Sequence, residues 1–91
     1  MEKKYADEGK MILGKRKKLM LTQLETCELS QIQFRVYQRY EHGDRSVSQA
    51  QMRFGLSLCA LLEIDPYELC FGMTREEYLL QAADIRENRK K

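Results

Sequence analysis

The segment QIQFRVYQRYEHG, from Gln31 to Gly43, carries the strongest structural signal in this chain. Its apolar residues recur at the three- and four-residue spacing of one helical face: Ile32, Val36, Tyr37 and Tyr40. Glutamine and arginine fill most of the other positions, with almost no acid. We expect a helix over residues 32–42 that ends at Gly43, because glycine tolerates the left-handed conformation that follows many helices. The two tyrosines are expected in the core.

The length and charge of the chain indicate one small globular domain. Its 91 residues are 33% charged and 43% hydrophobic, and the net charge is only +2. Residues 1–20 carry seven basic and three acidic groups, whereas residues 46–72 carry Arg53 against three acids. The chain therefore has no general bias toward nucleic acid, although a local basic surface is compatible with it.

The sequence contains no signal for a membrane or for export. Its apolar runs fall short of the roughly 20 residues that span a bilayer, and the charged start MEKKYADEGK lacks the apolar stretch of a signal peptide. Cys27, Cys59 and Cys70 are widely spaced and form no CxxC pair. We therefore expect a cytoplasmic protein with buried, reduced thiols and no membrane contact.

No residue pattern points to catalysis or to a bound metal or cofactor. His42 is the single histidine, so a zinc site with cysteine and histidine ligands is not expected. No glycine-rich phosphate loop is present, and no motif arranges a nucleophile or a carboxylate around His42. Glu76 and Glu77 fit charge compensation at a helix N-terminus better than acid–base chemistry. We expect no enzymatic activity.

Strand signals are missing, so the expected fold class is all-α. Besides residues 32–42, helices are expected over residues 3–19, 22–29, from Ser46 or Ser48 to 63, 66–70 and about 74–89. Thr22 with Glu25 and Thr74 with Glu77 are candidate capping boxes, and Asp65 is a candidate cap of the short fifth helix. The helix through QAQMRFGLSLCALLE is expected to be the central, most buried one.

Three sequence elements together resemble the phage lambda-repressor-like, XRE/Cro-type helix-turn-helix family. They are LTQ at Leu21–Gln23, VYQRYEHGDR at Val36–Arg45 and LCALLEIDPYEL at Leu58–Leu69. The resemblance implies a five-helix lambda-repressor-like DNA-binding bundle within residues 1–72. Residues 73–91 would add a C-terminal helix and a basic tail that packs on this domain or forms a dimer contact.

The resemblance also implies a function: a sequence-specific DNA-binding transcriptional regulator, with the helix at about 32–42 in the major groove of double-stranded DNA. The expected base-reading residues are Gln33, Phe34, Arg35, Gln38 and Arg39. The expected phosphate contacts are Gln23, His42, Arg45, Lys17 and Lys18. A homodimer would read two half-sites about one DNA turn apart. By analogy with the family, Arg16 and Glu41 are expected to form a buried structural ion pair.

Simpler interpretations of the same residues remain open. A face of glutamine and arginine is often only a solvated surface, and Phe34 can be an ordinary core residue. The lysines at 15–18 can be plain helix surface. Arg16 and Glu41 can be exposed charges of little energetic weight.

The predicted second helix departs from the family pattern. Thr26 would bring a hydroxyl into the core, where the carbonyl four residues earlier is its natural acceptor, and Gln31 would adopt a left-handed conformation. Leu24 and Leu29 fall at positions that are normally polar. The alternative function is therefore a protein-binding module, antitoxin-like or an accessory partner, on a degenerate helix-turn-helix scaffold, with Leu24 on its partner surface.

Overall fold

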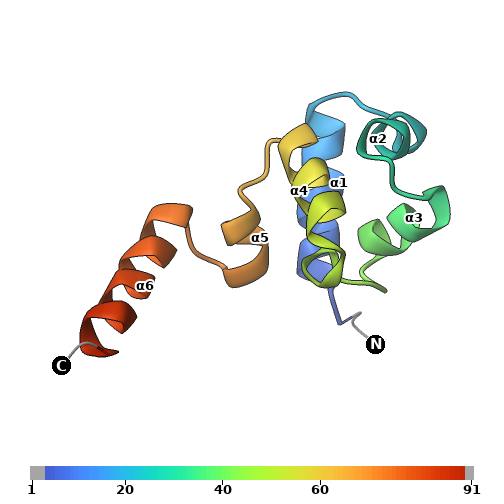
Figure 1. Ribbon diagram of the computed structural model, residues 1–91. Coiled ribbons are helices and arrows are strands. Elements are labelled where there is room, and N and C mark those ends of the chain that lie inside the picture. Colours follow the sequence, from blue (N-terminus) through green and yellow to red (C-terminus); the bar gives the residue numbers. More distant parts are fainter. Residues whose placement is uncertain (1–3, 90–91) are drawn as a thin grey trace.

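The computed structural model describes residues 4–89, and this part of the chain is all-helical, as predicted (Figure 1). Its elements are α1 (Ala6–Lys18), α2 (Gln23–Ser30), α3 (Phe34–His42), the 3-10 turn η1 (Val47–Gln49), α4 (Met52–Leu61), α5 (Pro66–Phe71) and α6 (Arg75–Arg89). The expected starting residue of the first helix, at position 3, and the end of the basic tail, at 90–91, lie outside the described residues.

The helix ends follow local side-chain chemistry. The Thr22 hydroxyl accepts the N–H of Glu25 and the Glu25 carboxylate accepts the N–H of Thr22, each at 3.0 Å, which confirms the first capping box. The carboxylate of Asp65 accepts the N–H of Tyr67 at 2.9 Å at the start of α5. The left-handed conformation expected at Gln31 is present, with φ 61°, so the turn between α2 and α3 is formed without glycine.

Three predicted helix starts are wrong, and the first is that of α1, which begins at Ala6 rather than at residue 3 because Tyr5 is its N-cap. The third helix begins at Phe34 rather than at residue 32, because Gln33 is extended and forms its N-cap. The fourth helix begins at Met52 rather than at Ser46 or Ser48. The carboxylate of Glu8 on α1 accepts the Ser46 hydroxyl at 2.8 Å and the N–H of Val47 at 3.1 Å, and these bonds hold the segment as the separate turn η1.

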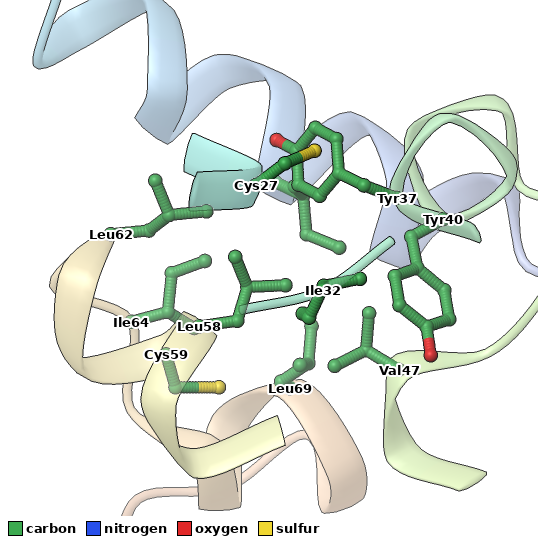
Figure 2. Packing of buried hydrophobic residues seen from close by; sticks show 11 residues of the cluster. Cys27, Ile32, Tyr37, Tyr40, Val47, Leu58, Cys59, Leu62, Ile64 and Leu69 are labelled. Carbon is green, nitrogen blue, oxygen red and sulfur yellow. The ribbon is translucent and has the colours of Figure 1, made fainter. Parts of the chain in front are cut away.

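The hydrophobic core lies between α1 and the helices from α2 to α5 (Figure 2). Its buried members are Ile12, Cys27, Ile32, Tyr37, Tyr40, Val47, Leu58, Cys59, Leu62, Ile64 and Leu69. Tyr37 and Tyr40 are core residues, as predicted. Only the second half of α4 is central, since Leu58 and Cys59 are buried while Met52 is 78% exposed.

Helix α2 turns a small and polar face toward the core. Thr26 is fully buried, and its hydroxyl donates to the carbonyl of Thr22 at 2.9 Å, the acceptor that the sequence predicted. The buried hydroxyl of Ser30 repeats this bond one turn later, to the carbonyl of Thr26 at 2.7 Å. Leu24 and Leu29 point to solvent, so α2 exposes its large apolar side chains.

The cysteines divide into two environments. Cys27 and Cys59 are buried, as expected, and burial raises the pKa of Cys59 to about 11. Cys70 is exposed, which corrects the expectation that all three thiols are buried. Cys70 lies on α5, at the edge of the domain from which the chain continues to α6.

Helix α1 crosses α3 at very close range. A Cβ atom on Gly9 would lie 2.5 Å from the carbonyl oxygen of Glu41 and 3.0 Å from that of Tyr40. Both neighbours are backbone atoms, so they cannot swing aside as a flexible side chain can. The missing side chain of Gly9 therefore allows the approach of the two helices, and the N–H of Tyr5 extends it by donating to the carbonyl of Gly43 at 3.1 Å.

Helix α6 extends away from this core. None of its described residues is buried, and it leaves the domain beyond α5 (Figure 1). Its first turn is held by aromatic contacts, with the rings of Phe71 and Tyr78 stacked at 4.5 Å between centroids. Within the described residues, α6 packs mainly against α5.

Substitution of the two α1 glycines by alanine tests the helix crossing. Gly9→Ala should lower the free energy of unfolding by about 1–3 kcal/mol, because the new methyl group overpacks a backbone contact. Gly14→Ala is the matched control, since a Cβ atom at this position would have no neighbour within 4 Å. It should stabilise the protein by up to about 1 kcal/mol. Denaturant unfolding measures both, and equal effects at the two sites would contradict the proposed crossing.

Candidate nucleic-acid interface

An ion pair fastens α1 to the end of α3. The guanidinium of Arg16 donates to the carboxylate of Glu41 through Nε at 2.6 Å and through Nη2 at 3.2 Å. Its third nitrogen, Nη1, donates to the carbonyl of Leu21 at 2.9 Å, in the connection between α1 and α2. The two side chains are 12% and 4% exposed. The pair expected from the sequence is therefore present, bidentate and largely withdrawn from solvent.

Opposing effects set the pKa of Glu41. Burial by itself raises the pKa, but hydrogen bonds from Arg16 and Gln23 outweigh burial and hold it below its ordinary value. The same bond raises the pKa of Arg16. The hydroxyl of Tyr37 lies beside this carboxylate without the geometry of a hydrogen bond, and burial is the main cause of its raised pKa. Glu41 is thus a carboxylate whose charge the folded domain stabilises.

Gln23 links the ion pair to the outer part of α3. Its Nε2 donates to the Glu41 carboxylate at 3.0 Å, and its Oε1 accepts from Nε2 of Gln38 at 3.5 Å. A charged carboxylate only accepts, so the amide of Gln23 must direct its nitrogen toward Glu41 and its oxygen toward Gln38. Sequence reasoning missed this chain of contacts. One N–H of Gln23 remains available for a phosphate oxygen.

The expected base-reading side chains lie on the solvent side of α3. Gln33, Arg35 and Arg39 are exposed, and Gln38 is half-buried beside Gln23. Phe34 is 39% exposed, so it is not a core residue. The solvent side of α3, together with its N-cap, therefore combines two amides, two guanidiniums and one aromatic ring, and of these Gln38 is half-buried.

A groove of about 570 Å³ runs from the start of α3 to the loop before α4. Gln33 and Arg45, predicted as base and phosphate contacts, both line it. Gln49 and Gln51 line it as well, and sequence reasoning did not select them because it assigned them to a helix interior. His42, Lys17 and Lys18 are exposed but do not line this groove.

Between residues 4 and 89, no group of three or more histidine, cysteine, aspartate or glutamate side chains is placed to hold a metal ion. In the same range, no helix has the length and apolar character needed to cross a bilayer.

Comparisons of the chain with models of protein families, with curated proteins and with solved structures find no match. The functional interpretation therefore depends on the side chains themselves, on their positions along α2 and α3, and on the charges that surround them.

Removal of Arg16 tests the ion pair. Arg16→Ala should destabilise the protein by about 3–5 kcal/mol, because it leaves the carboxylate of Glu41 buried without its main partner. Lys17→Ala removes a cation from the neighbouring position of the same helix, where the side chain is exposed, and should change stability by less than about 1 kcal/mol. Thermal melts of the two variants compare these effects. A melting temperature of Arg16→Ala equal to that of the wild type would contradict the structural role.

Acid unfolding tests the state of Glu41. Its pKa is lower in the folded than in the unfolded chain, so its contribution to stability is present above the unfolded value of about 4.3 and is lost as the pH falls through the folded value. Glu41→Gln should therefore reduce the loss of stability on acidification. Glu87→Gln, which alters an exposed carboxylate on α6, should leave that loss nearly unchanged. Denaturant titrations between about pH 2 and 6 provide the measurement.

Proposed function

We propose that this protein is a sequence-specific DNA-binding transcriptional regulator that inserts α3 into the major groove. The observation that carries the proposal is the composition of the exposed surface of α3. This surface presents arginine and glutamine, while the single acid of the helix, Glu41, is turned inward and paired with Arg16. This separation of charge favours contact of the helix with polyanionic DNA, because no outward acid repels the phosphates.

The dimensions of α3 suit the groove. Its nine residues span about 13 Å, and a helix with its side chains is about as wide as the major groove of B-DNA. Arg35 and Arg39 can each pair with guanine, Gln33 and Gln38 with adenine, and Phe34 can contact a thymine methyl group. Gln38 reaches this surface already oriented, because Gln23 holds one of its two amide hydrogens.

The phosphate contacts would surround this reading surface. Arg45 shares the groove with Gln33, and Gln23 stands at the first position of α2, where the free backbone N–H groups of a helix N-terminus favour anions. Lys17 and Lys18 would add charge, and His42 a ring N–H donor, without selecting a sequence. The resemblance to the lambda-repressor-like family supports the same arrangement of α2 and α3.

A protein-binding module is the second candidate, and the exposed apolar residues of α2 favour it. Leu24 is 56% and Leu29 is 61% exposed, and Met20, just before α2, is also open to solvent. Such residues suit a protein partner better than DNA. Binding held by them would respond weakly to salt, whereas DNA binding falls steeply with salt because each neutralised phosphate releases counterions.

Selection of bound sequences from a random pool of double-stranded DNA tests the first candidate. We expect recovery of a motif, and Arg35→Ala should relax the preference at one base pair by about 1–3 kcal/mol. Gln23→Ala should weaken binding to all sequences alike. Arg53→Ala, which removes an exposed arginine from α4, is the matched control and should retain the motif. Recovery of no motif at low salt would favour the protein-binding module.

A further inference from the structure

Two glutamine amides connect the buried carboxylate of Glu41 with the outer side of α3. Nε2 of Gln23 donates to Oε1 of Glu41 at 3.0 Å, and Nε2 of Gln38 donates to Oε1 of Gln23 at 3.5 Å. The side chain of Glu41 is 4% exposed, whereas both glutamines are half-buried, so these bonds lead from the interior toward solvent. We call the three residues Glu41, Gln23 and Gln38 the amide series.

The charge of Glu41 fixes the direction of each hydrogen bond in the amide series. The guanidinium of Arg16 can only donate, and the charged carboxylate that it pairs with can only accept. The pKa of Glu41 lies below its ordinary value, so the carboxylate is charged at neutral pH. Gln23 must therefore turn its nitrogen toward Glu41, which leaves its oxygen to accept from the nitrogen of Gln38.

This direction decides which atoms Gln38 offers to a ligand. A glutamine amide has two N–H donors and one oxygen acceptor, and Gln23 holds one of the donors. The other N–H and the oxygen remain, as a donor beside an acceptor. Adenine presents the complementary pair in the major groove, with the N7 acceptor beside the N6 amino donor. Guanine presents two acceptors there, N7 and O6, and leaves the oxygen of Gln38 without a donor.

A glutamine without such a contact can present either end of its amide. The amide turns about its last side-chain bond, so its nitrogen and oxygen exchange places with little other movement. Gln33 is exposed, and its side chain makes no capping hydrogen bond at the start of α3. Of these two glutamines, Gln38 is therefore the one whose amide the domain orients before a ligand binds.

We propose that Glu41 is a positioning residue for base recognition, and that its charge, acting through Gln23, directs the amide of Gln38 toward adenine. The inference rests on the proposed function, because the adenine belongs to DNA that α3 contacts. It gives Glu41 a role beyond its ion pair with Arg16, which orients whole helices. Glu41 itself does not meet the base, since its side chain is withdrawn from solvent.

Glu41→Gln should reverse the amide series. The oxygen of the substituted side chain should keep the shorter bond, from Nε of Arg16 at 2.6 Å, because the guanidinium only donates. The nitrogen then takes the place of Oε1 and faces Gln23, which must turn its oxygen inward and its nitrogen outward. Gln38 then turns its oxygen toward Gln23 and its nitrogen toward the position where adenine also has a donor. The variant therefore opposes the base that the wild type favours.

NMR of the free protein tests the amide series without DNA. In the wild type, the amide protons of Gln23 should show nuclear Overhauser contacts to the side chain of Glu41 rather than to Gln38. Glu41→Gln should shift the amide protons of Gln38 and leave those of Gln81 unchanged, which is the matched control because Gln81 is exposed on α6. In the Gln23→Ala background, Glu41→Gln should no longer shift the amide of Gln38.

Binding to single-base variants of the selected DNA tests the consequence for recognition. At the base pair that Gln38→Ala identifies, replacement of adenine should weaken binding of the wild type by about 5- to 150-fold. Glu41→Gln should abolish this preference and keep the preferences that Arg35 and Arg39 supply. Addition of Gln23→Ala to Glu41→Gln should restore the preference for adenine, because Gln38 is then free to turn toward either base partner.

The results separate this inference from the proposed function. The expected amide shifts without any selected DNA motif would overturn the proposed function and the preference for adenine, but would support control of Gln38 by Glu41. A motif that Glu41→Gln weakens equally at every base pair would overturn the positioning role. So would contacts of the Gln23 amide protons with Gln38 instead of Glu41 in the wild type. Circular dichroism melts establish that each variant folds, and the wild-type contacts remain decisive should Glu41→Gln fail to fold.

Discussion

The bond between Arg16 and Glu41 is the constraint on which the arrangement of the first three helices depends. One guanidinium joins the carboxylate at the end of α3 and the carbonyl of Leu21 before α2, so a single side chain sets three elements against each other. Such a pair adds little net stability, because desolvation of the two charges offsets their attraction. The pair instead orients α1, α3 and the connection before α2 relative to one another, and it also neutralises the acid of α3 inside the domain.

Helix α1 supports the C-terminal end of α3. Gly9 lets its backbone reach that of Glu41, Glu8 caps the turn η1 beyond α3, and Tyr5 bonds the carbonyl of Gly43. These contacts hold the C-terminal end of α3 and the segment after it, without using the outer side chains of α3. A surface built in this way is available to a ligand with little further ordering, and reduced ordering cost favours affinity.

The sequence predicted those features that neighbouring residues determine. The capping box at Thr22 and the left-handed turn at Gln31 follow from residues within a few positions of each other. The start of α4 was placed too early because the bonds that stop a helix at Ser46 come from Glu8, 38 residues earlier. A local pattern cannot show such an acceptor, since Ser46 and Ser48 are also good helix caps.

The same limit applies to the candidate site. The exposure of Arg35 and Arg39 follows from the position of the apolar stripe on α3, but the contact of Gln23 with Gln38 depends on the angle between two helices. The family resemblance supplied the ion pair, which no spacing within the chain requires. The resemblance implied only a phosphate contact for Gln23. In the structure, the amide of Gln23 donates to the carboxylate of Glu41 inside the protein.

Although the net charge of the chain is only +2, acidic and basic side chains lie on different sides of two of its helices. At one end, α3 withdraws its acid and presents arginine; at the other, α6 groups its arginines with apolar residues and turns its acids away. Both patterns require specific placement, because a soluble helix needs only a mixed polar surface. Mixed charges alternating around α6 would have kept a lone helix equally soluble. On α3 the separation of charge suits the proposed binding of DNA, and on α6 it leaves an exposed side of apolar and basic residues.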